Sequence, residues 1–139
     1  MSVEQNKALV RRFVEEFWNS GNMAAADELI AGDAILSLPG VGQTNLDTFK
    51  QFAQTLRGAF PDWHSTVEEM LGEENSVAER WTGRGTHQGV FQGTAPTGRR
   101  VMVPGVVFYR IASGKITEFR GQFDGVVLMQ QIGAIPAHS

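Results

Sequence analysis

Polar and apolar side chains alternate near the C-terminus, and the polar ones include groups capable of acid–base chemistry. The polar set is Glu118, Arg120, Gln122 and Asp124, and the apolar set is Phe119, Gly121 and Phe123. Since successive side chains of a strand point to opposite faces, each set shares one side. If the polar set faces a pocket, a carboxylate, an amide and a guanidinium line it. If the apolar set does, this strand offers no reactive group.

Two carboxylates of this run are candidates for proton transfer. Removing a proton from a carbon beside a carbonyl needs a base, and the oxyanion that forms needs a hydrogen-bond donor. We predict Asp124 as the acid–base group, Glu118 as a reserve base and Gln122 as an orienting or oxyanion group. Other roles stay open, because Asp124 precedes a predicted helix and suits an N-cap, and Glu118 suits a structural or interface carboxylate.

Two side chains outside this run complete the predicted catalytic set. His87 ends a predicted strand beside a Gly-rich loop over 88–98, where it would donate to an oxyanion or anchor the loop through a hydrogen bond. Arg80 alternates with Ala78 and Thr82 and is a further orienting or oxyanion group. The loop itself is a candidate lid or a passive connection.

Several aromatic side chains are candidates for stacking on a flat apolar ligand. The predicted substrate-binding set is Phe17, Trp18, Phe52, Trp63 and Phe108. Their helical and strand spacing also suits an ordinary core, so both interpretations stay open.

Three predicted helices precede most of these side chains. The first begins with a capping box formed by Ser2 and Gln5 and ends at Gly21. Apolar residues at helical spacing predict a second helix over 23–30 and a third over about 46–59.

The rest of the chain is predicted to be mainly strands. Turn residues, including the Gly-rich loop over 88–98, separate β-rich runs over 63–71, 76–86, 99–111 and 115–123, and an earlier short strand covers 33–38. Asp124 would cap a last helix over about 125–131. Helices followed by strands that turns and loops connect indicate an α+β fold. We expect a single domain over 1–139, in which three N-terminal helices pack on a curved antiparallel sheet and give the molecule the shape of a cone. Such a cone leaves an apolar, aromatic pocket.

Composition excludes several classes of protein. The 139 residues are 42% hydrophobic and 19% charged, which is typical of a folded chain and not of a disordered one. No cysteine is present, so disulfide scaffolds and thiolate metal sites are excluded, and the three histidines His64, His87 and His138 make a histidine metal cluster improbable. We therefore predict no metal site.

Charge and hydropathy predict neither a nucleic-acid partner nor a membrane partner. The net charge is −3 and the basic residues are scattered, so no nucleic-acid partner is expected. No apolar run is long enough to span a membrane, and the N-terminus lacks the layout of a signal peptide. The expected location is cytoplasmic.

Short motifs along the chain resemble one family. They are Trp18-Asn19-Ser20-Gly21-Asn22, Ala59-Phe60-Pro61-Asp62-Trp63, Gly85-Thr86-His87-Gln88-Gly89, Ala95-Pro96-Thr97-Gly98-Arg99-Arg100, Gly114-Lys115-Ile116-Thr117-Glu118 and Leu128-Met129-Gln130-Gln131-Ile132-Gly133. In this order and spacing they resemble the SnoaL-like polyketide cyclases of the nuclear-transport-factor-2-like fold, over about residues 6 to 133. The resemblance implies a cone-shaped α+β barrel, a homodimer through the outer face of the sheet, and intramolecular aldol ring closure without metal or cofactor.

The resemblance also leaves alternatives open. The acid–base Asp of the family and its His neighbour align with Gly121 and Phe119 of this chain. The first hypothesis is a cofactor-independent cyclase or isomerase that acts on a polyketide-like or other apolar carbonyl compound. The second is a non-catalytic protein that binds an apolar small molecule. A third is an epoxide-opening hydrolase or cyclase, since such relatives combine an Arg, here Arg80 or Arg120, with Asp residues around a water.

Overall fold

The computed structural model describes residues 1–136 as a helical layer against one six-stranded sheet. The N-terminal part comprises α1 (Val3–Phe13), the π-helical segment η1 (Val14–Asn19), α2 (Met23–Leu29), β1 (Ile30–Leu38), β2 (Gly42–Thr44) and α3 (Leu46–Ala59). The C-terminal part comprises β3 (His64–Glu73), β4 (Ser76–Thr86), β5 (Arg100–Ala112), β6 (Lys115–Phe123) and α4 (Gly125–Gln131). This order confirms the predicted α+β class. No helix in this described part of the chain is both long and apolar enough to cross a membrane.

The first helix begins at the predicted capping box and changes form before it ends. The Gln5 amide donates to Ser2 Oγ (3.1 Å), and the Ser2 amide donates to Gln5 Oε1 (2.9 Å). After Phe13 the backbone bonds widen to the pattern of a π-helix, as from the Ser20 amide to the Glu15 carbonyl oxygen (2.9 Å). Sequence spacing does not predict this change, because apolar residues keep the period of an α-helix through the segment.

Four strands form consecutive hairpins, whereas β1 joins the sheet in parallel. The strand order is β2-β1-β6-β5-β4-β3, with β1 parallel to β6 and the other neighbours antiparallel. The prediction of a wholly antiparallel sheet is corrected here to a mixed sheet. Two short turns, 74–75 and 113–114, and the longer loop 87–99 join β3 to β6 as successive antiparallel strands. β1 meets β6 without a direct connection, so no local signal sets its direction. The short strand β2 was not predicted.

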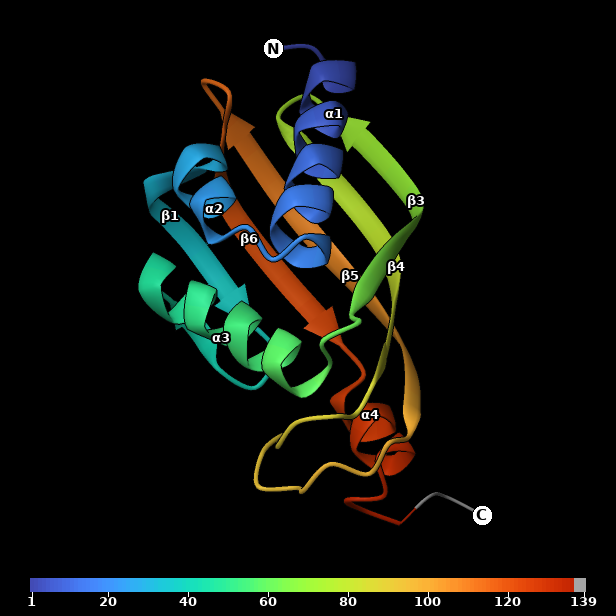
Figure 1. The fold of residues 1–139 in the computed structure, drawn as a ribbon. Helices are drawn as coiled ribbons and strands as arrows, with labels where there is room; N and C mark the ends of the chain where they lie inside the picture. Colours follow the sequence, from blue (N-terminus) through green and yellow to red (C-terminus); the bar gives the residue numbers. More distant parts are fainter. Residues whose placement is uncertain (137–139) are drawn as a thin grey trace.

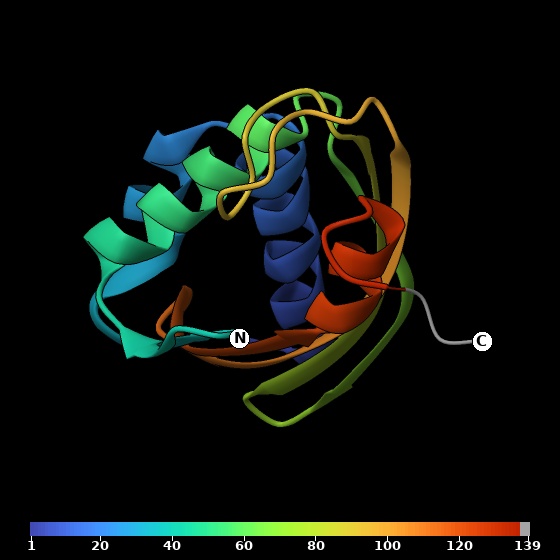
Figure 2. The same ribbon diagram turned by 90° about the horizontal axis from the view of Figure 1, so that it is seen from below.

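The sheet curves around the helices that pack on its inner face and gives the predicted cone, which does not close into a barrel. α1, α2 and α3 cover the inner face, and α4 lies at one end of the sheet near the loop between β4 and β5 (Figure 1). Seen from below, the sheet curls beneath α1 (Figure 2). The edge strands β2 and β3 do not pair with each other. An open end of the cone follows from this arrangement.

The core fills the cone between the inner face of the sheet and the helices. Phe13, Phe17 and Phe49 are fully buried, with ring centroids 5.1 Å apart for Phe13 and Phe17 and 5.3 Å apart for Phe17 and Phe49. Tyr109 and Phe119 continue this aromatic cluster from β5 and β6. Because close packing restrains each ring, the cluster forms a firm wall for the space beside it.

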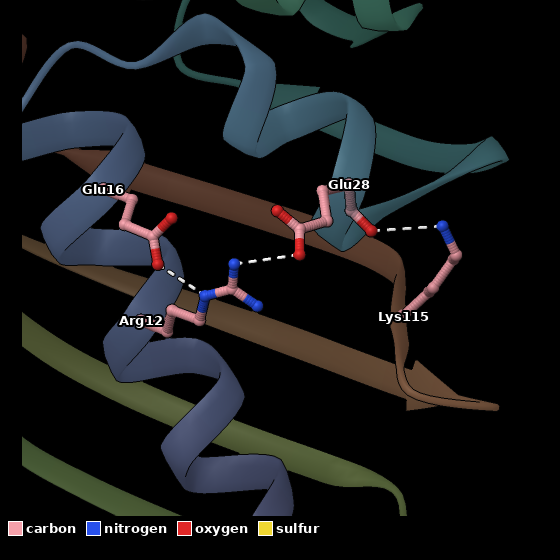
Figure 3. Close-up of polar contacts among 4 residues, drawn as sticks. All are labelled: Arg12, Glu16, Glu28 and Lys115. Atoms are coloured by element: carbon pink, nitrogen blue, oxygen red, sulfur yellow. Dashed lines mark hydrogen bonds and ion pairs between the residues drawn. The ribbon is translucent and has the colours of Figure 1, made fainter.

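A polar tie joins the first two helices to the start of β6. Arg12 on α1 contacts both Glu16 in η1 and Glu28 on α2, and Lys115 Nζ donates to the Glu28 carbonyl oxygen (3.1 Å), as Figure 3 shows. The side chains of the two ion pairs are 35–59% exposed, so each pair contributes little stability by itself. Together these contacts connect α1, η1 and α2 to the start of β6.

Candidate functional site

An apolar pocket lies between the inner face of the sheet and the helices η1 and α3. It encloses about 530 Å³ of empty space, part of which is continuous with solvent. Aromatic side chains dominate its walls, among them Trp18, Trp63, Trp81, Phe119 and Phe123. The polar side chains on the lining are Ser65, Glu79, Tyr109 and Gln122. A small apolar molecule suits such a site, with these few polar groups fixing its orientation.

Glu79 is the buried carboxyl group of this pocket. It lies on β4 and is only 3% exposed, because the alternation of the strand turns it inward together with Val77 and Trp81. The Tyr109 hydroxyl on the neighbouring strand β5 donates to Glu79 Oε1 (2.8 Å), and Tyr109 is fully buried. No hydrogen bond among residues 1–136 reaches Glu79 Oε2. One carboxyl oxygen is thus held by tyrosine, and the other is free for a ligand.

Burial governs the proton affinity of this pair. Loss of solvent raises the pKa of Glu79 from 4.5 to about 7, although the hydrogen bond from Tyr109 and the positive charge of Arg11 act in the opposite direction. Burial and the adjacent carboxylate raise the pKa of Tyr109 well above 10, so its hydroxyl keeps its proton. Near neutral pH both protonation states of Glu79 are populated, which suits a group that accepts and returns a proton.

Sequence analysis missed both members of the pair, although a signal for Glu79 existed. Glu79 shares its period-2 face with Val77 and Trp81, so an inward-facing β4 carries one carboxylate among apolar side chains. Tyr109 is the sole tyrosine of the chain and lies at an apolar position of β5. Which faces turn inward, and that the two residues meet, follows only from pairing between strands.

The strand β6 turns its apolar set toward the pocket. Phe119 and Gly121 line the pocket, whereas Glu118 is turned to the outer face of the sheet, where it pairs with Arg120 (3.0 Å) and Arg110 (3.6 Å). Gln122 is exposed and borders the pocket.

The remaining members of the predicted catalytic set lie apart from Glu79. Arg80 is exposed on the outer face and pairs with Glu69 (3.4 Å). Asp124 caps α4, accepting a hydrogen bond from the Val127 amide (3.0 Å), as the alternative interpretation of this residue expects. The structure does not bring Arg80, Glu118 and Asp124 together, and their catalytic roles stay predictions.

His87 is fully buried at the base of the loop between β4 and β5. Its Nδ1 accepts a hydrogen bond from the Thr97 amide (3.3 Å) and lies 3.0 Å from Thr97 Oγ1. Backbone bonds from the His87 amide to the Arg99 carbonyl and from the Gly98 amide to the His87 carbonyl close the same loop. This geometry matches a loop anchor, and His87 is not among the residues that line the pocket.

The predicted aromatic set divides between pocket, core and outer surface. Trp18, Phe52 and Trp63 line the pocket. Phe17 is fully buried in the core instead. Phe108 lies on the outer face of β5 with the Arg110 guanidinium 5.3 Å from its ring centroid. The structure thus brings three of these side chains to the site.

No metal cluster is formed by the residues that the structure describes. Within residues 1–136 no three His, Asp or Glu side chains converge in a way that would hold a metal ion. His138, one of the three histidines, lies outside the described residues.

Comparison with a known family agrees with this geometry. Residues 8–132 match the family described as SnoaL-like polyketide cyclase, which is most of the chain. The chain belongs to the SnoaL-like polyketide cyclase family. The resemblance of the motifs is therefore confirmed. No curated protein matches the chain.

Solved structures of SnoaL-like proteins share the fold over nearly their whole length. AclR from Streptomyces galilaeus, a candidate hydroxylase, is 28% identical, with a TM-score of 0.90, over 99% of this chain and 87% of AclR. IdmH from Streptomyces antibioticus, a candidate polyketide cyclase, is 30% identical, with a TM-score of 0.84, over 93% of this chain and 99% of IdmH. A candidate SnoaL-like cyclase from Jannaschia is 26% identical, with a TM-score of 0.86, over 96% and 94% of the two chains.

Proposed function

We propose that this SnoaL-like protein is a cofactor-independent cyclase or isomerase of an apolar carbonyl compound, with Glu79 as its acid–base group. The observation that carries the proposal is a buried carboxyl group, held by one tyrosine, on the wall of a mostly apolar pocket. The two functions named among its structural relatives, cyclase and hydroxylase, show that the fold alone does not choose the reaction.

The proposed ring closure needs no external reagent. The Glu79 carboxylate takes a proton from the carbon beside a carbonyl, which gives an enolate. The enolate carbon attacks a second carbonyl carbon of the same molecule, so a C–C bond forms and an alkoxide remains. The alkoxide takes the proton back from Glu79, and the carboxylate is restored. An isomerase would use the first step and return the proton to a different carbon.

Tyr109 orients the carboxyl group during this cycle. Its hydroxyl donates to Oε1 and leaves Oε2 for the substrate. Because Tyr109 is fully buried and its pKa lies well above 10, it remains a donor to Glu79 throughout. Because Glu79 is only 3% exposed among apolar side chains, few water molecules can screen it, which strengthens its electrostatic contacts.

Proton exchange at a simple ketone tests the proposal without knowledge of the natural substrate. We would follow deuterium incorporation at the carbons beside the carbonyl of 2-tetralone in D₂O by proton NMR. The enzyme-dependent rate should rise with pH, with a midpoint near 7, as Glu79 ionises. Glu79→Gln should lower this rate at least about 100-fold.

Two comparison variants sharpen this experiment. Glu69→Gln, an exposed carboxylate on the outer face, should keep the wild-type rate. Asp124→Asn tests the role predicted for the cap of α4. A loss with Asp124→Asn and not with Glu79→Gln would contradict the assignment of Glu79.

A second candidate function is binding without chemistry. It is favoured by Phe119 and Gly121, which line the pocket where the resemblance expects the acid–base pair. Exchange of 2-tetralone at the buffer rate, together with saturable binding of the same ketone, would support this candidate and exclude the first.

We also propose that two copies of the chain pair through the outer face of the sheet. Met102, Val106 and Phe108 are 55%, 53% and 36% exposed on the outer side of β5. Apolar side chains grouped on one strand face typify an interface.

A further inference from the structure

Ser65 gives the pocket a second polar position that the acid–base chemistry does not use. It is 7% exposed and lines the same pocket as Glu79. Trp63 Nε1 donates to Ser65 Oγ (3.0 Å), so the serine oxygen already acts as an acceptor. No hydrogen bond among residues 1–136 uses the Ser65 hydroxyl as a donor. Its hydrogen is free for a ligand.

Hydrogen bonds from the Asn19 side chain to the backbone of Ser65 hold this residue in place. The Ser65 amide donates to Asn19 Oδ1 (2.7 Å), and Asn19 Nδ2 donates to the Ser65 carbonyl oxygen (3.0 Å). Arg57 Nη1 in turn donates to the carbonyl oxygens of Trp18 and Asn19 (3.0 Å each). The end of η1 and the start of β3 are thereby joined, and a donor fixed in this way orients a ligand without first being ordered.

Strand register sets the distance between the two polar positions. Ser65 pairs with Gly83, which is four positions along β4 from Glu79. At about 3.3 Å per residue along the strand and about 4.8 Å between neighbouring strands, the Cα atoms of Ser65 and Glu79 are roughly 14 Å apart. If the two side chains point in the same direction, hydrogen bonds of about 3 Å at each end leave roughly 8 Å between the two ligand atoms, which is about the span of two fused rings that carry an oxygen at each end.

The surface between these positions is flat and aromatic. A Cβ on Gly105 would lie 2.2 Å from the Trp81 ring, and one on Gly83 would lie 2.8 Å from it. The indole therefore rests on the backbone of both strands, where only glycine leaves space for it. Such a surface suits a flat, conjugated molecule that stacks on the ring.

We propose that the substrate is a flat apolar ketone about two rings long, with a second oxygen acceptor at its far end that the Ser65 hydroxyl binds. The reacting end rests on the proposed function of Glu79, whereas the far end rests on Ser65 alone. Ser65 is then a specificity-determining residue that selects for the distant oxygen and takes no part in proton transfer.

A matched pair of ketones tests this inference. The probes are 6-methoxy-2-tetralone, which has an ether oxygen opposite its carbonyl, and 6-ethyl-2-tetralone, which has nearly the same shape without that oxygen. Dissociation constants would be measured by isothermal titration calorimetry. The wild type should bind the methoxy compound about fivefold more tightly than the ethyl compound, the effect of one hydrogen bond.

Three variants assign that preference. Ser65→Ala should bring the ratio of the two dissociation constants close to one, and Ser65→Thr, which keeps a hydroxyl and the acceptor for Trp63, should retain it. Thr66→Ala removes a hydroxyl from the opposite face of the same strand and should leave the ratio unchanged. Glu79→Gln should also keep the ratio while it abolishes proton exchange.

The outcomes separate the two proposals. A wild-type ratio near one, or a ratio that survives Ser65→Ala in a folded protein, overturns the role of Ser65 and leaves Glu79 untouched. A preference that depends on Ser65, without any proton exchange, supports the role of Ser65 in binding and overturns the proposed enzyme.

Discussion

A single carboxyl group, Glu79, carries an electrostatic cost that the rest of the pocket does not relieve. Among residues 1–136 its hydrogen-bond partner is the Tyr109 hydroxyl, and the positive charge of Arg11 lowers its pKa only in part. Burial therefore dominates, and the pKa of Glu79 rises to about 7. A site built for stability alone would place an apolar side chain here, so the carboxyl group is the residue that function best explains.

Glu79→Gln should stabilise the protein at alkaline pH. The folded state holds this proton to higher pH than the unfolded state, so the stability that Glu79 contributes is present below about pH 4.5 and is lost as the pH rises to about 7. A rise in pKa from 4.5 to about 7 corresponds to about 3 kcal/mol. Urea unfolding should show both proteins nearly equal at pH 4.5 and the variant more stable at pH 8, by up to that amount.

The difference between the two proteins isolates Glu79 from other titrating groups. Asp62, whose pKa is lowered chiefly by the hydrogen bond from the Thr86 hydroxyl, contributes an opposite trend in both proteins and cancels. A difference in unfolding free energy that does not change between pH 4.5 and 8 would show that Glu79 is not the buried titrating group described here.

At the scale of elements, β4 and β5 make room for two tryptophan rings by having glycine beneath them. Gly83 and Gly105 lie under Trp81, and Gly83 also lies under Trp63, whose ring would be 2.3 Å from an added Cβ. The glycines weaken each strand on their own, since they lack a side chain to pack. The tryptophan rings above them offset this loss of stability by burying a large apolar area, and they form the pocket floor.

Gly105→Ala should disturb that floor. The new methyl group would lie 2.2 Å from the Trp81 ring, so the indole must move. We expect a loss of about 1–3 kcal/mol in unfolding free energy and a shift in tryptophan fluorescence. Gly58→Ala on α3 is the matched control, because nothing lies within 4 Å of its added Cβ, and it should leave the protein equal or up to about 1 kcal/mol more stable. Equal stability of Gly105→Ala and wild type would contradict the described packing.

Local signals predicted most elements, and distant pairing accounts for those that were missed. The bounds of β4, β6, α3 and α4 agree with the prediction, because caps and turn residues lie beside them. The parallel pairing of β1 with β6 and the bonding of Tyr109 to Glu79 join residues far apart in sequence, which no local pattern records. Which set of β6 side chains faces inward also follows from pairing with β1 and β5, so the alternation in sequence does not choose between the two sets.

At the scale of the whole molecule, the sheet has one covered face and one open face. The inner face packs on helices, but on the outer face Met102 and Val106 remain more than half exposed and Phe108 is 36% exposed. Charged pairs such as Glu118 with Arg120 border these side chains. An apolar centre with a polar rim is the usual anatomy of a protein interface.

Val106→Glu should separate the proposed dimer. Two copies related by a twofold axis would place the new carboxylates in an apolar interface, so dimer dissociation should become easier by at least about 100-fold. Analytical ultracentrifugation over a range of concentrations would measure this change. Val41→Glu makes the same substitution at a valine that is 50% exposed in the turn between β1 and β2, and it should not alter assembly. A wild-type protein that stays monomeric at high concentration would refute the proposed pairing.

The parallel pairing of β1 with β6 has a consequence for synthesis on the ribosome. Leu36 must meet Phe119, so β1 has only the short β2 beside it until nearly the whole chain has been made. The N-terminal helices, with their large aromatic faces, emerge before the long strands that will cover them. Contacts between residues far apart in sequence form slowly, so the nascent chain exposes the apolar faces of its N-terminal helices before the strands can cover them. Chaperones that bind this chain during translation should therefore bind mainly to about the first sixty residues.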